Sequence, residues 1–315
     1  MPTVYGPVPS RRLGQSLGID PIPQKACNYN CVYCQLGRTV RLTHHRQDFF
    51  PPEAILAEAL RVLAGWDLQS TAPIDYVTFV GQGEPLLCAS LGWLIRQVKA
   101  HTDIPVAVIT NGSLLFLPEV RQELSAADVV LPSLDAADEA TFRHINRPWS
   151  QLHIDEIMRG LAAFRREFAG RLWVEVMLVR GVNDGEGCLR NISTALAEIG
   201  PDQVHINVPI RPPAEPWVQP PDDAALERAA DILGHAAQPM LPAEGAFHLA
   251  AGLPLADAVE QIIRRHPMRE HELSALLNDR APHEIEEALK QLEADRRVRR
   301  LEFGGQLFWT HAGRR

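Results

Sequence analysis

Three cysteines stand close together near the start of the chain, at Cys27, Cys31 and Cys34. Their spacing is C-x3-C-x2-C, and they are three of only five cysteines in 315 residues. Three thiolates in one short loop can converge on a soft metal centre, but they cannot complete a four-cysteine site. A [4Fe–4S] cluster held by this loop would therefore keep one iron free of protein ligands.

Two other interpretations of these cysteines stay open at this point. A structural zinc site would need a fourth ligand, for which His44 or His45 is available. Structural zinc sites usually take C-x2-C pairs from two separate segments, and the sequence holds no second pair. The other interpretation is a chance group of buried cysteines. The number and spacing of the ligands favour the iron–sulfur cluster.

The run Cys27-Asn-Tyr-Asn-Cys31-Val-Tyr-Cys34 resembles the signature of the radical SAM superfamily. The resemblance implies that S-adenosylmethionine chelates the open iron through its amino and carboxylate groups. An electron from the reduced cluster would then cleave the sulfonium and leave a 5'-deoxyadenosyl radical. The resemblance also implies that Tyr33, which precedes the third cysteine, lies against the adenine.

Composition and charge narrow the class of protein. The chain is 46% hydrophobic and 22% charged, which fits one large globular domain with room for a small second one. Since we find no signal peptide and no apolar run of 18 residues, we expect no membrane span and a reducing compartment, the cytoplasm. The net charge of −8 gives no overall footprint for nucleic acid. Residues 254–315 hold 11 basic and 11 acidic residues, so this segment is the relatively basic one.

Apolar runs alternate with helical patterns over the first two thirds of the chain, which indicates an α/β fold. The predicted strands are 16–19, 74–80, 106–110, 128–132, 172–179 and 203–208. Continuous apolar runs are typical of a parallel sheet covered by helices. Because polar motifs follow strand after strand, a barrel is favoured over a doubly wound sheet. The radical SAM resemblance implies a partial (β/α)6 TIM-like barrel.

We expect three parts along the chain. Residues 1–215 form the barrel, and residues 216–253 form a helix and a linker that pack on it. Residues 254–315 carry three helical patterns and then a hairpin with a Gly304-Gly305 turn. This order resembles a winged-helix domain.

Polar residues at the strand ends are the candidates for cofactor binding. Gly81-Gln82-Gly83-Glu84-Pro85 follows the second strand and resembles the family's GGEP motif, with Gln82 in place of the commoner glycine. Glycines allow close approach of the backbone, so Gly81, Gly83 and Glu84 would offer oxygen acceptors to the methionine ammonium. Short polar side chains after later strands suit ribose hydroxyls and the methionine carboxylate, with turn capping as the alternative. They are Thr110, Asn111, Ser133 and Asp135; Asn183 follows the fifth strand, and Asn207 and Val208 could flank the adenine.

Several arginines stand out as candidates for anion binding. Arg147 could clamp a carboxylate by bidentate geometry, with a helix-end salt bridge as the alternative. Arg11 and Arg12 are either a solvated pair or face an anionic group of the substrate at the barrel mouth. A basic run leads into the hairpin and could touch a nucleic-acid backbone, although exposed glutamates on the preceding helix oppose phosphates. Its members are Arg296, Arg297, Arg299 and Arg300.

The run at residues 5–23 resembles radical SAM proteins described as related to wyosine synthesis. This implies hydrogen abstraction from an RNA or tRNA base. Wyosine synthesis uses a second cluster, but Cys88 and Cys188 supply only two further thiolates. The alternatives are radical modification of a peptide or protein, and a non-catalytic iron–sulfur sensor whose winged helix reads DNA. Besides S-adenosylmethionine, an enzyme of this kind needs an electron donor such as a flavodoxin or ferredoxin.

Overall fold

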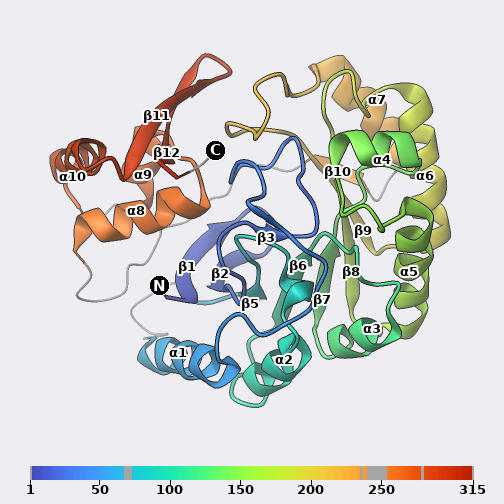
Figure 1. Ribbon diagram of the computed structural model, residues 1–315, viewed down its shortest axis with the longest axis horizontal. Helices are drawn as coiled ribbons and strands as arrows, with labels where there is room; N and C mark the ends of the chain where they lie inside the picture. Colours follow the sequence, from blue (N-terminus) through green and yellow to red (C-terminus); the bar gives the residue numbers. More distant parts are fainter. Residues whose placement is uncertain (1, 67–72, 235–236, 240–253, 278–279, 314–315) are drawn as a thin grey trace.

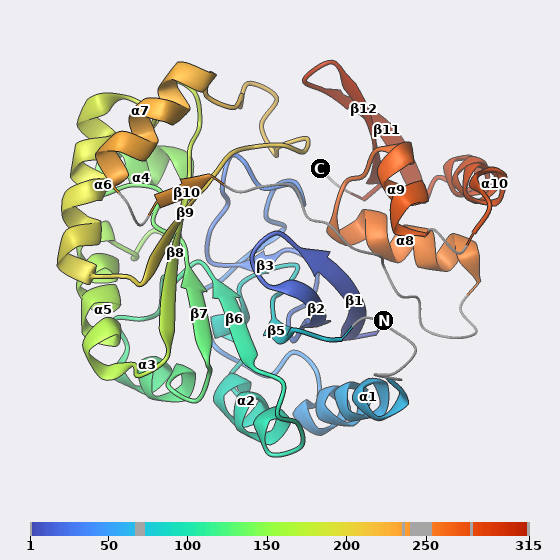
Figure 2. The same ribbon diagram turned by 180° about the vertical axis from the view of Figure 1, so that it is seen from behind.

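A curved eight-stranded sheet forms the centre of the molecule (Figures 1 and 2). The structure is a computed structural model that describes residues 2–66, 73–234, 237–239, 254–277 and 280–313. The spatial order of the strands is β1-β2-β5-β6-β7-β8-β9-β10. Their bounds are β1 Val4–Ser10, β2 Gly14–Ile19, β5 Tyr76–Phe79, β6 Val106–Thr110, β7 Val129–Pro132, β8 Arg171–Met177, β9 Gln203–Asn207 and β10 Ala237–Pro239.

The six strands from β2 to β9 are parallel to one another, as the apolar runs predict. The mixed α/β architecture with its parallel sheet confirms the partial-barrel expectation. Two edge strands were missed. Strand β1 pairs antiparallel with β2 and is rich in half-buried residues, so it lacks the continuous apolar run of a central strand. Strand β10 pairs parallel with β9, in a stretch that we expected to be an irregular linker.

Helices cover the outer face of the sheet (Figure 1). Helix α5 (Ile154–Glu167) shows how the sequence achieves this, because it buries Ile154, Ile157, Leu161 and Phe164 at helical spacing. The other covering helices are α1 Pro52–Gly65, α2 Leu91–Lys99, α3 Pro118–Leu124, α4 Glu139–Ile145, α6 Glu186–Ile199 and α7 Asp223–Leu233. Proline opens α1 and α3, where its missing N–H costs nothing.

A second, smaller cluster of apolar side chains lies on the inner side of the sheet. Ala107 and Val129 belong to it, whereas their neighbours Val106, Val108 and Val130 belong to the main core. Successive side chains of a strand point to opposite faces, so the inner cluster fills the interior of the barrel. The polar strand ends lie beyond this apolar filling.

Three helices and a hairpin form a C-terminal unit with its own apolar core. The elements are α8 Leu255–Arg265, α9 Glu270–Leu276, α10 Pro282–Ala294, β11 Val298–Phe303 and β12 Gln306–His311. Gly304 and Gly305 both have positive φ, as the tight turn between the strands requires. The order of elements agrees with the sequence. The winged-helix identity and the domain boundaries stay predictions.

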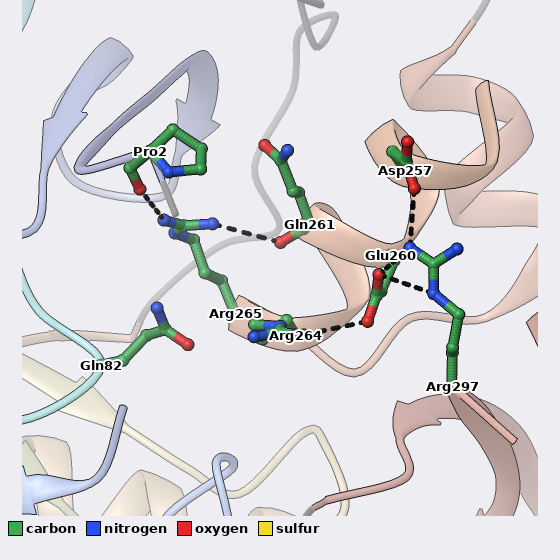
Figure 3. A pocket seen from close by; sticks show the side chains of 8 residues that line it. All are labelled: Pro2, Gln82, Asp257, Glu260, Gln261, Arg264, Arg265 and Arg297. Carbon is green, nitrogen blue, oxygen red and sulfur yellow. Dashed lines mark hydrogen bonds and ion pairs between the residues drawn. The ribbon is translucent and has the colours of Figure 1, made fainter. Parts of the chain in front are cut away.

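The C-terminal unit contacts the barrel through α8 and the residues just after it. The Arg265 guanidinium stacks on the Tyr5 ring at 4.2 Å and donates to the carbonyl of Pro2. A cavity of about 220 Å³ lies at this junction, and Figure 3 shows Arg265 and Gln82 on its wall. No helix in the described part of the chain is long and apolar enough to cross a membrane.

Candidate active site

The cysteine loop follows β2 and lies across the carboxyl ends of the parallel strands. On one side it is bound to the end of β5, because Glu84 N–H donates to the Ala26 carbonyl at 3.0 Å and Lys25 N–H donates to the Gln82 carbonyl at 2.7 Å. On the other side Asn30 N–H donates to the Asn146 carbonyl at 3.0 Å. The loop is therefore fixed between β5 and the end of α4, at the face where barrel enzymes place their chemistry.

Each of the three loop cysteines is half-buried and has a polar neighbour. Tyr29 N–H donates to Cys27 Sγ at 3.4 Å, and Asn146 Nδ2 lies 3.6 Å from Cys31 Sγ. Lys25 Nζ donates to Cys34 Sγ at 3.1 Å. N–H groups and an ammonium aimed at sulfur suit thiolates, so these surroundings fit a metal-bound state better than a chance apolar group.

Burial raises the pKa of the Cys27 thiol to about 12, and it raises the pKa of Cys31 further. The other two thiols contribute to the shift at Cys31, which places all three within electrostatic reach of one another. Buried thiolates need a compensating cation, and the irons of a cluster supply it. Among the described residues, no group of His, Cys, Asp or Glu is placed to hold a single metal ion. His44, the candidate fourth zinc ligand, packs its ring on Trp149 at 4.7 Å.

Gly83 brings the strand-end motif into contact with the cysteine loop. A Cβ at this position would lie 1.8 Å from the Ala26 carbonyl oxygen and 2.7 Å from a methyl group of Ile22. No side chain fits there, so the backbone of the motif approaches the residue just before Cys27 as only glycine permits. This close approach is the observation that best fits S-adenosylmethionine, whose ammonium would need the nearby oxygen acceptors.

Gln82, the departure from the family's motif, has a defined role. Its backbone N–H and its side-chain Nε2 both donate to the Asp20 carboxylate, at 3.2 and 3.1 Å. Burial raises the pKa of Asp20 to about 6, while Arg265 and these hydrogen bonds oppose the shift. Gln82 thus connects the end of β5 with the residue that follows β2.

The Glu84 carboxylate is buried and is used mainly by the protein itself. It accepts hydrogen bonds from Leu86 N–H at 2.9 Å, Thr110 Oγ1 at 2.5 Å and Asn111 N–H at 2.7 Å. These occupy three of its roughly four acceptor sites. Burial raises its pKa to about 7 despite the three donors. Glu84 and Thr110 therefore position the ends of β5 and β6, and direct contact of Glu84 with the ammonium is not favoured.

A second network surrounds Asp135 at the end of β7. Its carboxylate accepts hydrogen bonds from the Tyr33 hydroxyl, from Asn146 Nδ2 at 2.7 Å and from Met177 N–H at 2.8 Å. Burial raises its pKa. The network fixes the ring of Tyr33, which lies between Cys31 and Cys34 in the sequence. Asp135 therefore also supports the cysteine loop.

The remaining strand-end candidates divide into two kinds. Asn183 is fully buried, and its amide is spent on the carbonyls of Asp135 and Met177 and on Val179 N–H. Its predicted cofactor contact stays a prediction, and these hydrogen bonds show that the side chain also holds the ends of β7 and β8 together. Ser133 lies opposite Glu175 of β8, and Val208 remains half-buried. Asn207 Oδ1 accepts from Arg11 Nη2 at 3.2 Å, so this residue faces a basic group.

Most of the predicted anion-binding arginines outside the N-terminal pair are already matched by carboxylates. Arg147 Nη1 lies 2.5 Å from Glu215, as the salt-bridge alternative expects. Arg297 pairs with Asp257 and Glu260, and Arg300 pairs with Glu293. Arg299 has an interaction of its own, and Arg296, two residues before the hairpin, has a positive φ of 57°. Two of the four arginines of the basic run, Arg297 and Arg300, are therefore neutralised within the C-terminal unit.

Several residues of the site were missed from the sequence. Asn28 donates to Ser113 Oγ at 2.6 Å and accepts from Asn111 Nδ2 at 2.7 Å, so it links the cysteine loop to β6. Asn146 serves both Cys31 and Asp135, and Lys25 serves Cys34. The asparagines between the cysteines and beside Arg147 were visible signals, because such amides often bridge loops.

Comparison with known proteins agrees with this geometry. The family model described as the radical SAM superfamily matches residues 22–187, more than half of the chain. A UPF0026 protein of Methanocaldococcus jannaschii is 34% identical over 313 residues, which cover 98% of this chain and 96% of that protein. A GTP 3',8-cyclase of Heliobacterium modesticaldum is 32% identical over 163 residues, 51% of this chain and 46% of that protein.

Among solved structures, SuiB of Streptococcus suis superposes with a TM-score of 0.52 at 14% identity, over 73% of this chain and 49% of that one. At this identity the likeness shows the fold alone. The chain belongs to the radical SAM superfamily. It is accordingly a radical SAM enzyme, and its cofactors are S-adenosylmethionine and a [4Fe–4S] cluster.

Proposed function

We propose that this enzyme holds its cluster through Cys27, Cys31 and Cys34 and modifies a nucleobase, with an RNA base as the first candidate. When bound, the cofactors supply an electron and the adenosyl radical that abstracts hydrogen from the substrate. The chain's own residues bind, orient and shield. An electron donor such as a flavodoxin or ferredoxin would reduce the cluster.

The observation that carries this proposal is the convergence of the cysteine loop with three strand ends. Gly83 allows the backbone to approach the loop, Glu84 fixes the Thr110-Asn111 turn, and Asp135 fixes Tyr33. All three anchor points lie at the carboxyl ends of the parallel strands. This arrangement preorganises a pocket wall beside the thiols, so that little ordering remains to be done when the cofactor binds.

Two observations support a nucleobase as substrate. The relative named GTP 3',8-cyclase acts, by its name, on a nucleotide, and the side of the barrel mouth near β9 carries arginines suited to phosphate. A winged-helix role for residues 254–315 would add an RNA-binding surface. One feature favours a peptide instead, since α10 exposes Glu286 and Glu287, which repel phosphates and suit a basic peptide.

The test is anaerobic reconstitution with iron and sulfide, reduction with dithionite, and measurement of 5'-deoxyadenosine. We expect product from the wild type, none from Cys31→Ser, and unchanged product from Cys188→Ser, which removes a thiol outside the loop. Transfer RNA, mononucleotides and basic peptides are then added in separate reactions. Stimulation or a mass change with RNA or nucleotide supports the substrate class. An effect confined to the peptides contradicts it.

A further inference from the structure

Three arginines meet where the open side of the barrel faces the C-terminal unit. Arg11 and Arg12 lie in the turn between β1 and β2, and Arg211 follows β9. Arg11 Nη2 donates to Asn207 at the end of β9, and Arg211 Nη1 donates to Gln35 Oε1 at 3.3 Å. Arg11 lies within electrostatic reach of both Arg12 and Arg211. We call these three residues the arginine cluster.

In the described part of the chain, too few carboxylates lie next to the arginine cluster to form an ion pair with each arginine. Glu175 of β8 pairs with Arg12, but Arg11 and Arg211 make no ion pair within the described residues. Glu272 of α9 lies within electrostatic reach of Arg211, yet its carboxylate is bound to Arg269 by both the guanidinium and the backbone N–H. Arg211 Nε is buried and has no hydrogen-bond partner there. Two of the three arginines therefore make no ion pair among the described residues, and Glu175 and Glu272 act on them only from a distance.

Residues of the C-terminal unit lie beside the arginine cluster. Arg265 and His266 follow one another at the end of α8, and Gln35 Nε2 bridges to the Arg265 carbonyl at 3.3 Å and to His266 Nδ1 at 3.1 Å. Burial and the surrounding arginines lower the pKa of His266 well below its usual value. The same two causes lower the pKa of Arg11 to about 10. Buried unpaired cations are costly, and a bound anion would remove that cost.

The arginine cluster lies beside the candidate cofactor site and not on a remote surface. Gln35, the partner of Arg211, directly follows Cys34 in the chain. Glu175, the partner of Arg12, bridges to Ser133 and lies within electrostatic reach of Asp135. Asn207, the partner of Arg11, ends the strand next to β8. A group held by the three arginines would thus be close to the thiols, on the side of the mouth away from Glu84.

We propose that Arg11, Arg12 and Arg211 bind a phosphate group of the substrate. Guanidinium groups present paired N–H donors that match phosphate oxygens, and two arginines without an ion pair match a phosphate better than a singly charged carboxylate. The inference rests on the proposed nucleobase substrate and names the part of it that the enzyme holds. The phosphate comes from an RNA backbone or from a free nucleotide, and the experiment separates these sources.

The experiment measures binding without turnover, with the reconstituted protein kept oxidised. The probes are guanosine, guanosine 5'-monophosphate, inorganic phosphate and a short single-stranded RNA, measured by calorimetry and by the shift in Tm. We expect the monophosphate to bind at least about tenfold more tightly than the nucleoside. Arg211→Gln and Arg11→Gln should each remove about tenfold of that difference, Arg211→Lys should restore part of it, and Arg61→Gln on the exposed face of α1 should change nothing.

Tight binding of RNA without binding of the monophosphate assigns the site to backbone phosphate. Equal binding of RNA and of the monophosphate assigns the site to a nucleotide. Equal affinity of the wild type for nucleoside and monophosphate, with no RNA binding, overturns the inference, as does phosphate binding that survives both glutamine variants. If a glutamine variant does not fold, the wild-type comparison and Arg211→Lys still decide. Because formation of 5'-deoxyadenosine is assayed separately, failure here is distinguishable from failure of the proposed function.

Discussion

The two sides of the barrel mouth carry opposite charge. Around the ends of β5, β6 and β7, the buried carboxylates Glu84 and Asp135 are surrounded by neutral donors, and each accepts three hydrogen bonds. Around β9 and the β1–β2 turn, Arg11 and Arg211 are surrounded by neutral acceptors and have no carboxylate partner among the described residues. On the first side the protein itself supplies hydrogen-bond donors to the carboxylates, whereas the second side keeps an excess of positive charge.

This difference indicates different tasks. A carboxylate with all its hydrogen bonds made by the protein holds a rigid wall, which suits the side where the cofactor must be oriented. Unpaired arginines in a half-buried position are stabilised by a ligand, which suits the side where the substrate is recognised. The basic run of the hairpin resembles the first side in one respect, which is that the protein itself supplies the partners of its charged groups. Arg297 and Arg300 are paired with carboxylates.

The largest effect is expected from Gly83→Ala on the carboxylate side. The new Cβ would overlap the Ala26 carbonyl, which must move together with the neighbouring Cys27. Displacements of this size cost on the order of a hundredfold in rate, so formation of 5'-deoxyadenosine should fall by at least that factor. Gly187→Ala in α6, where a Cβ meets nothing within 4 Å, is the matched control. Equal activity of the two variants would contradict the close approach.

The buried carboxylate should also show itself in the pH dependence of stability. Glu84 has a pKa of about 7 in the folded protein, raised by burial from 4.5. Its contribution is therefore fully present below about pH 4.5 and is lost as the pH rises through 7, by on the order of 3 kcal/mol. Urea unfolding of the cluster-free protein should show this loss, and Glu84→Gln should remove it. An unchanged pH profile in the variant would assign the dependence to other groups.

On the arginine side, Glu175→Gln should sharpen the contrast. Removing the partner of Arg12 leaves a third arginine without an ion pair, so inorganic phosphate should bind roughly threefold more tightly. The free energy of unfolding should fall by about 2 kcal/mol, because a partly buried ion pair is broken. Calorimetry and urea unfolding measure the two quantities. Weaker phosphate binding would show that Glu175 orients the site instead of neutralising it.

The smallest effect is expected from the paired arginines of the hairpin. Arg297→Gln breaks the ion pairs with Asp257 and Glu260, which should cost about 1 kcal/mol or less of stability. Phosphate and RNA binding should not change, since this charge is already neutralised. If Arg297→Gln lowers the affinity for RNA and reduces the salt dependence of that affinity, the phosphate site lies at the hairpin. The contrast between the two arginine groups would then be wrong.

Much of the fold could be predicted from the sequence because parallel strands are buried on both faces. The runs that became β5, β7 and β8 are continuous and apolar, and each ends at a polar motif. Strand β1 lacked this signal, since an edge strand with prolines and half-buried residues reads as loop. The hairpin was evident from its Gly304-Gly305 turn, because only certain residues tolerate that conformation.

The site was predictable only where a residue type is demanded by chemistry or by space. Cysteine thiols and Gly83 met that condition. The roles of Asn28, Asn146 and Gln82 depend on which loops come together, and no local pattern contains that information. The same reason explains Asn183, whose polar side chain at a strand end is consumed by backbone groups. Pairing between distant segments, as for Arg147 and Glu215, was likewise outside the reach of spacing alone.

The most direct test of the account is the electron paramagnetic resonance spectrum of the reduced, reconstituted protein with and without S-adenosylmethionine. We expect about four irons per chain, bound through Cys27, Cys31 and Cys34, and a [4Fe–4S] signal that shifts when S-adenosylmethionine is added. Gly83→Ala should lose the shift. A wild-type cluster whose spectrum ignores S-adenosylmethionine would contradict the assignment of the open iron and of the surrounding wall.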